Sequence, residues 1–286
     1  MLHLPIVTDN VTIGVMSTQV RGVAGRVRAS EAAAWALSHG RVAMTRDELA
    51  DLLGVPADQV RRRLLAPTRR GEWVSPARGL WVPVPPQYLT WGAPPALEFI
   101  DALMRHLGTP YYVGWLTAAS IYGASHHAPQ VTQVAVAKSI AARRAGRNRI
   151  EFYLRSGLGA IPTAPRRTRS GDVPVSTPEA TALDLADDTS AAGGIDNVGN
   201  VIVGLVEETG LDDAALAAAA GLFPAAAARR VGWIAEHHTD SGSLPLLRQV
   251  AHRQPSPSKL APFEPAREHL DREWNLYINH EMDIDA

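Results

Sequence analysis

Two short helical segments separated by a glycine, between residues 45 and 65, place the strongest limit on what this chain can fold into. The first segment, TRDELADLLGV, begins at Thr45, whose hydroxyl suits a helix N-cap, and has Glu48 at the reciprocal capping position. Gly54 ends that helix, and Pro56 suits the first turn of the next segment, PADQVRRRLL. Two short helices joined by a glycine-containing turn of about 3–4 residues predict a helix-turn-helix.

The second helix separates its apolar and polar side chains onto different sides. The apolar side is expected to pack inward and consists of Ala57, Val60 and Leu64. A recognition helix must present hydrogen-bond donors to base edges and phosphates in the major groove of DNA. We therefore predict that Gln59 and Arg62 contact bases and that Arg61 and Arg63 contact phosphates. A run of arginines on a helix is also a common solvated surface, so this prediction depends on its neighbours.

Those neighbours complete a DNA-binding unit. A helix is expected from Ser30, and the stretch APTRRGEWVSPARGLWVPVP predicts a β-hairpin whose strands flank the turn SPARG. A hairpin directly after a recognition helix is a wing, and its basic residues can touch the DNA backbone or the minor groove. The residues expected to contact DNA are Thr45, Arg46, Gln59, Arg61, Arg62, Arg63, Arg69, Arg70 and Arg78.

The net charge of −1 hides an uneven distribution along the chain. Residues 17–90 hold 11 Arg against 6 acidic residues, and residues 91–175 hold 10 basic against 4 acidic residues. Residues 176–286 hold 7 basic against 18 acidic residues. A basic front and an acidic back indicate nucleic acid as a partner of the front part.

The remainder predicts a mixed α/β body. Prolines 83–95 predict a linker, residues 96–108 and 109–124 two helices, and residues 131–137 and 149–154 two strands with a basic connector between them. A capped helix is expected over 176–188, with mainly helices from residue 196. We therefore predict an α+β protein: a leader over 1–20 that need not be ordered, a winged helix-turn-helix over 21–90, and a larger C-terminal domain over 91–286 that ends in helices.

Several function classes find no support in the sequence. The chain has no cysteine, no apolar run long enough to span a membrane, and no basic stretch typical of a secretory signal near its start, so a cytoplasmic protein is expected. Neither metal-binding nor phosphate-binding spacings occur. A metal-dependent nuclease would need clustered carboxylates, whereas the two predicted strands offer only Glu151, with Lys138 nearby. We predict no catalytic residues, no metal and no cofactor.

The order of several segments resembles the AbiEi family of antitoxins, from abortive-infection toxin–antitoxin systems that act in phage defence. These segments are RRGEWVSPARGLWVPVP, YYVGWLTAASIYGASHH, VTQVAVAKS, VPVSTPEATALDLADD and REWNLYIN. The resemblance implies a non-enzymatic protein whose N-terminal domain binds operator repeats and represses its own operon. It also implies a C-terminal domain that takes part in neutralising a nucleotidyltransferase-like toxin.

Two questions stay open at the level of sequence. An additional basic patch, Arg143, Arg144, Arg147 and Arg149, could extend the DNA footprint or assist cooperative assembly on the operator, contact the toxin or its nucleic-acid substrate, or simply be solvated loop charge. The alternative function is a transcriptional regulator without a toxin partner, whose C-terminal domain senses a ligand. Tyr111, Tyr112 and Trp115 would then line its pocket, although core packing is the commoner use of such rings.

Overall fold

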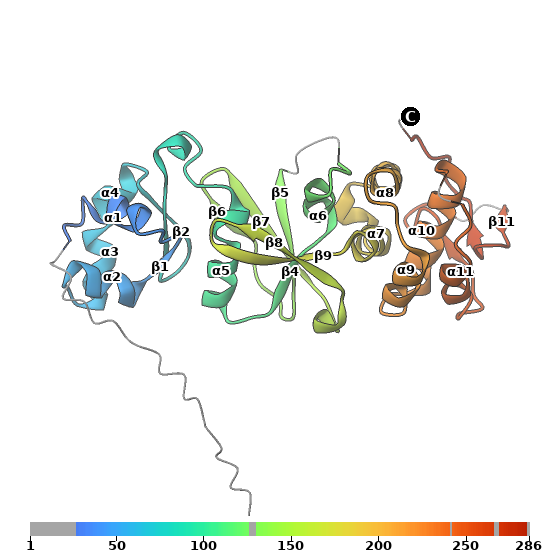
Figure 1. Cartoon of the computed structure of the whole chain (residues 1–286), viewed down its shortest axis with the longest axis horizontal. Coiled ribbons are helices and arrows are strands. Elements are labelled where there is room, and N and C mark those ends of the chain that lie inside the picture. The colour runs from blue at the N-terminus through green and yellow to red at the C-terminus, as the bar shows by residue number, and fades with distance from the viewer. Residues whose placement is uncertain (1–26, 126–129, 241, 266–268, 285–286) are drawn as a thin grey trace, which may run out of the picture.

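The computed structural model describes residues 27–125, 130–240, 242–265 and 269–284. These residues form three bodies along one long axis: a helical N-terminal unit, a central sheet and a C-terminal group of helices (Figure 1). The leader predicted over residues 1–20 lies outside the described residues. The combination of helices and sheets confirms the predicted α+β class.

The N-terminal unit follows the element order of a winged helix-turn-helix. Its three strands form an antiparallel sheet of order β1-β3-β2, and β2 and β3 form the wing. Leu49, Val60, Leu64 and Trp73 fill the core beneath the helices. The elements are α1 (Ala32–Ser38), β1 (Met44–Thr45), α2 (Arg46–Leu53), the 3-10 turn η1 (Ala57–Gln59), α3 (Val60–Arg63), α4 (Leu65–Arg69), β2 (Trp73–Ala77) and β3 (Leu80–Pro83).

The helical segment after the turn extends to Arg69, beyond its predicted end near Leu65, and it is not one continuous helix. The backbone breaks at Leu64 and restarts as α4, which places Pro67 within the first turn of a new helix. In a first turn the missing N–H of proline costs no hydrogen bond. Arg69 therefore ends α4 and Arg70 caps it, so the prediction that these two arginines belong to the wing is wrong.

The proline-rich stretch after the wing packs closely against the central body. It contains two 3-10 turns, η2 (Pro86–Tyr88) and η3 (Ala96–Glu98), and it buries Ala93 and Ala96. The backbone N–H of Arg147 donates to the carbonyl of Trp91 over 2.9 Å, and the Asn148 amide donates to the carbonyl of Pro94 over 2.7 Å. Because these bonds and a continuous apolar cluster cross the stretch, it is a packed connection rather than a loose linker.

The central body is a six-stranded mixed sheet of order β6-β7-β5-β4-β9-β8. The β5–β7 and β4–β9 pairs are parallel, and the other neighbours are antiparallel. The strands are β4 (Tyr111–Val113), β5 (Val131–Val136), β6 (Arg143–Ala145), β7 (Asn148–Leu154), β8 (Thr163–Thr168) and β9 (Gly171–Ser176). They are accompanied by α5 (Ile100–Leu107), α6 (Trp115–Ile121) and the 3-10 turn η4 (Leu158–Ala160).

Alternate residues of the central strands pack on opposite faces of this sheet. Val113, Val134 and Val136 join the cluster under α5, whereas Tyr112 and Ala135 join the cluster that continues into the C-terminal helices. A sheet buried on both faces explains the consecutive apolar residues Tyr111–Val113 and Val134–Val136. Two predictions need correction here: residues 111–113 are a strand and not the start of a helix, and the basic connector contains the edge strand β6.

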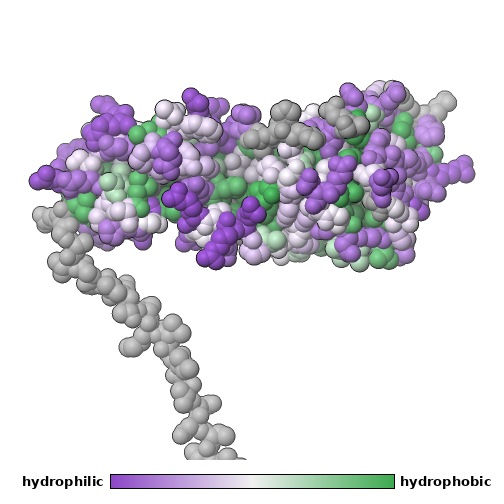
Figure 2. Space-filling view, turned by 45° about the horizontal axis from the view of Figure 1, so that its top comes forward, coloured by the Kyte–Doolittle hydropathy of each residue, from purple (hydrophilic) through white to green (hydrophobic). Residues whose placement is uncertain are grey.

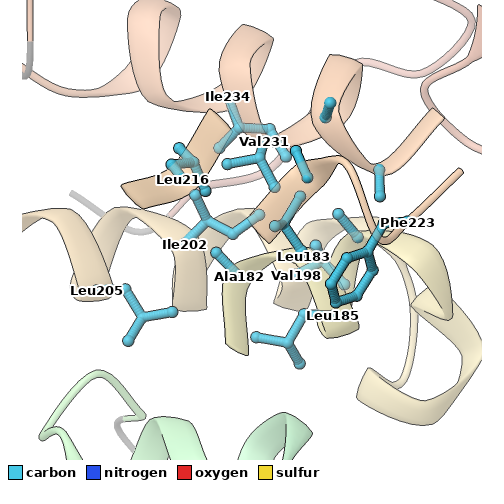
Figure 3. Close-up of a cluster of buried hydrophobic side chains, with 14 of the residues drawn as sticks. Ala182, Leu183, Leu185, Val198, Ile202, Leu205, Leu216, Phe223, Val231 and Ile234 are labelled. Atoms are coloured by element: carbon cyan, nitrogen blue, oxygen red, sulfur yellow. The ribbon is translucent and has the colours of Figure 1, made fainter. Parts of the chain in front are cut away.

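The C-terminal body packs helices around one apolar core that continues from the sheet. Leu183 of α7, Ile202 of α8, Leu216 of α9 and Val231 of α10 point toward one another in Figure 3. The elements are α7 (Pro178–Asp187), the 3-10 turn η5 (Thr189–Ala192), α8 (Ile195–Thr209), α9 (Asp213–Ala220), α10 (Ala225–His238), α11 (Pro245–Ala251) and a small sheet of β10 (Ser258–Lys259), β11 (Leu270–Asp271) and β12 (Leu276–Tyr277).

Two buried arginines of α10 tie the last segment to these helices. Arg229 donates to the carbonyls of Ala251, Gln254 and Ser256, and Arg230 donates to the carbonyls of Ala186 and Leu260. Burying a guanidinium is costly unless its donors are satisfied, and here backbone carbonyls satisfy them. Two cations of the acidic C-terminal part are therefore unavailable to a partner.

Candidate nucleic-acid interface

The predicted recognition helix lies in η1, α3 and α4, and this segment of residues 57–69, called the recognition helix below, presents one buried stripe and several exposed side chains. Val60, Leu64 and Pro67 are buried against the N-terminal core, whereas Arg61, Arg62 and Arg63 are all exposed. This confirms that Val60 and Leu64 point inward. Hydrophilic residues cover much of the N-terminal unit, at the left in the view of Figure 2.

A groove with a volume of about 1130 Å³ runs between the recognition helix, the start of α2 and the wing turn formed by Arg78 and Gly79. Its lining from the recognition helix is Ala57, Asp58, Arg61, Leu65 and Thr68. The spacing of Asp58, Arg61, Leu65 and Thr68 is that of one helical stripe, adjacent to the buried one. Arg46 and Arg78 contribute positive charge from the other two walls.

The groove brings together some of the predicted DNA-contacting residues and separates others. Arg46, Arg61 and Arg78 line it, whereas Gln59 and Arg62 are not among its lining residues. The Arg62 guanidinium instead donates to the Gln59 side-chain oxygen over 3.4 Å. Arg70 is held by Glu72, with 2.6 Å between Arg70 Nε and Glu72 Oε1. The base contacts of Gln59 and Arg62 therefore remain predictions.

Thr45 lines the groove but already has a structural task. Its side-chain oxygen accepts the backbone N–H of Glu48 over 3.4 Å, and the Glu48 carboxylate accepts the backbone N–H of Thr45 over 2.7 Å. This capping box confirms the predicted start of α2. Burial acts to raise the pKa of Glu48, but the hydrogen bonds with Thr45 and the charge of nearby Arg41 outweigh it. The pKa of Glu48 is therefore lower than its usual value. Thr45 thus fixes the helix end that forms one wall.

The sequence reasoning missed one residue from outside the N-terminal unit. The imidazole of His106, on α5 of the central body, hydrogen-bonds through Nε2 to the carbonyl of Arg78 over 3.0 Å. The same wing turn is joined to α2, because the backbone N–H of Arg46 donates to the carbonyl of Gly79 over 2.9 Å. No sequence pattern signals His106, since the contact joins residues 28 positions apart in different bodies.

The additional basic patch lies on the β6–β7 hairpin and does not line the groove. Arg149 forms an ion pair with Glu151, and Arg143 is only half exposed. Arg144 and Arg147 are exposed and have no ion-pair partner within the described part of the chain. Of the four arginines, Arg144 and Arg147 are therefore the two that are both exposed and unpaired among the described residues.

A buried carboxylate cluster joins the sheet to α7. The hydroxyl of Tyr112 lies 3.0 Å from both carboxylate oxygens of Asp184, and Arg155 lies 3.4 Å from Asp184 and 3.0 Å from Asp187. Burial raises the pKa of Asp184 to about 7, although Arg155 and the Tyr112 hydrogen bond act in the opposite direction. In the sequence, Asp184 is the only charged residue of the stretch TALDLA. This isolated charge is the sequence feature that could have indicated the cluster.

Nothing in the described residues forms a group of three or more His, Asp or Glu side chains that could hold a metal ion. The cluster around Asp184 instead contains a cationic side chain, Arg155, which pairs with both Asp184 and Asp187. Within the same residues, no helix is long and apolar enough to cross a bilayer.

Residues 112–237 match the family model for the AbiEi antitoxin C-terminal domain. The resemblance to the AbiEi antitoxins is therefore confirmed. The match begins in β4 and ends in α10, so this AbiEi domain contains the Asp184 cluster and most of the central sheet. The groove and its supporting His106 lie outside it.

The fold is also similar to a solved structure. The crystal structure of the RV2827C protein from Mycobacterium tuberculosis aligns with a TM-score of 0.63 and 18% sequence identity. The alignment covers 88% of this chain and 92% of that chain, so the likeness in fold extends well beyond the AbiEi domain. No curated protein matches the chain.

Proposed function

We propose that this protein is the antitoxin of a two-gene toxin–antitoxin system that also represses its own operon. The N-terminal domain over residues 21–90 binds operator repeats, and the part from residue 91 onward neutralises a nucleotidyltransferase-like toxin in the cytoplasm. The observation that carries the proposal is the connection of a cation-lined winged-helix groove to an AbiEi antitoxin domain in one chain. The protein acts without catalysis or cofactor.

Two features support DNA as the ligand of the groove. Arg46, Arg61 and Arg78 come from three separate elements and converge on one groove between the recognition helix and the wing. Arginine binds phosphates and guanine edges through two parallel donors, and such contacts make affinity fall steeply with salt. Arg144 and Arg147 of the hairpin add phosphate contacts outside the groove and assist cooperative assembly on the operator.

The ligand-sensing alternative finds less support. It needs a pocket around Tyr111, Tyr112 and Trp115, but the hydroxyls of both tyrosines are bonded to carboxylates, at Asp101 and Asp184. The ring of Trp115 lies 4.6 Å from that of Tyr153. These side chains are used in packing the sheet against its helices.

Co-expression with the neighbouring toxin-like gene tests the proposal. The wild-type chain should restore growth of cells that express that gene, and it should repress a reporter placed behind its own upstream DNA. An R61A/R78A variant should lose repression and still restore growth, because both residues lie outside the AbiEi domain. Failure of the wild-type chain to restore growth would refute the antitoxin role, whereas failure to repress would refute autoregulation alone.

A further inference from the structure

The groove carries two carboxylates among its cations, which is unusual for a surface that receives a polyanion. Asp47 is paired, with 3.2 Å between Arg46 Nε and Asp47 Oδ1. Asp58 lies on the exposed stripe of the recognition helix and has no ion-pair or hydrogen-bond partner for its carboxylate among the described residues. An unpaired negative charge therefore faces the space in which we place the DNA.

Such a charge weakens binding to any duplex unless the DNA supplies a donor. Phosphates repel a carboxylate, and a carboxylate that loses water without gaining a partner is strongly disfavoured. In the major groove the strongest match for Asp or Glu is the N4 amino group of cytosine. A side chain that is penalised on most sequences and satisfied on a few supplies selectivity rather than affinity.

The neighbours of Asp58 on the same stripe are suited to base edges. Arg61 follows it by three residues, which places the two side chains side by side on the helix surface. Arginine pairs with guanine through two bonds. Leu65 is 49% exposed although it is a large apolar residue, and an apolar side chain in this position suits the methyl group of thymine. The stripe thus combines an acceptor, a double donor and an apolar contact.

We infer that Asp58 is a specificity-determining residue that accepts a hydrogen bond from the N4 amino group of a cytosine in the operator. The base-reading stripe is then Asp58, Arg61 and Leu65, in place of the predicted pair Gln59 and Arg62. This inference rests on the proposed DNA-binding function. It goes beyond that function by naming the side chains that contact bases.

Selection from a library of random double-stranded DNA with the full chain tests the inference. The wild-type protein should enrich a motif with a fixed C·G pair. Asp58→Ala should lose the preference at that pair only, and Asp58→Asn should shift it toward A·T, because an asparagine side chain pairs with adenine. On one fixed duplex, replacing the C·G pair should weaken wild-type binding about tenfold and leave Asp58→Ala unaffected.

Asp51→Asn is the matched control, since Asp51 is an exposed carboxylate of α2 that does not line the groove. It should enrich the wild-type motif. If Asp58→Ala binds every duplex more tightly but keeps the wild-type motif, Asp58 acts by repulsion alone and the inference is wrong. If the wild-type protein enriches no motif at all, the proposed DNA-binding function fails instead. Thermal unfolding followed by circular dichroism verifies that each variant is folded.

Discussion

His106 of the central body holds the wing turn of the N-terminal unit by a 3.0 Å hydrogen bond from its ring to the carbonyl of Arg78. A carbonyl can only accept, so the Nε2 atom of His106 carries a proton in this contact. The groove that we assign to DNA is therefore bordered by one residue of the body that continues into the AbiEi domain.

Removal of this support should weaken DNA binding. His106→Ala is expected to lower affinity for the operator about 2- to 10-fold, since a net hydrogen bond contributes about 0.5–1.5 kcal/mol and the wing keeps its other contacts. Binding titrations at fixed salt measure the change. His39→Ala is the control, because His39 is also exposed in the N-terminal unit but lies outside the groove. Equal losses in both variants would argue against a positioning role for His106.

The interior around Asp184 predicts a pH dependence of stability. Burial raises the pKa of Asp184 to about 7, from 3.8 for an unperturbed carboxyl. A carboxyl with a raised pKa binds its proton more tightly in the folded state, so its contribution is full below pH 4 and is lost as pH rises toward 7. The loss is at most about 1.4 kcal/mol per pH unit.

Thermal unfolding between pH 4 and pH 8 measures this effect. The wild-type melting temperature should fall as pH rises through this range, and Asp184→Asn should reduce that slope because an amide does not titrate. Asp187→Asn serves as the comparison, since Asp187 lies on the same helix and binds the same Arg155. A slope that is unchanged in Asp184→Asn would show that other groups cause the pH dependence.

A glycine in the middle of α10 allows a tryptophan to approach the helix. A Cβ atom at Gly232 would overlap the ring of Trp274, which is fully buried and donates through Nε1 to Glu236 over 2.9 Å. We expect Gly232→Ala to destabilise the fold by roughly 1–3 kcal/mol, the usual cost of overpacking a core. Denaturant unfolding measures it, and Gly159→Ala, with open space around the glycine, should be nearly neutral. Near-wild-type stability of Gly232→Ala would contradict this account.

Local signals predicted the N-terminal unit well because short-range chemistry determines it. Thr45 and Glu48 define the start of α2, Gly54 ends it, and the burial of Val60 and Leu64, four residues apart, orients the next helix. The helix α4 was not predicted, because a proline in the first turn of a restarted helix looks the same in sequence as a proline that ends one.

The central sheet was harder to predict because long-range pairing determines it. Tyr111–Val113 is too short to show a strand period, and it runs directly into the apolar helix α6. Between β4 and α6 the backbone changes direction at Trp115, which has a positive φ of 49°. A tryptophan rarely adopts such a φ, so the sequence does not indicate this boundary. The β8–β9 hairpin was missed for another reason: β8 is an exposed edge strand rich in polar residues.

For the candidate site, the sequence predicts exposed arginines on the helix after the turn, and of Arg61, Arg62 and Arg63 only Arg61 lines the groove. The sequence placed arginines on the outer side of the recognition helix, but which stripe faces the groove depends on the wing and on α5. Those elements are placed by packing with the central body, as the contact of His106 with the wing turn illustrates. Helix periodicity alone therefore does not determine which of these arginines lines the groove.

The β6–β7 hairpin gives a prediction about salt dependence. If Arg144 and Arg147 each neutralise one phosphate, the R144A/R147A variant should reduce the slope of log affinity against log salt concentration by about 1.8, since each contact contributes about 0.9. Binding titrations over a series of salt concentrations give the slope. R253A/R272A removes the same charge from exposed positions of the C-terminal body and should leave the slope unchanged. A similar decrease in both variants would mean that overall charge, and not contact by the hairpin, sets the salt dependence.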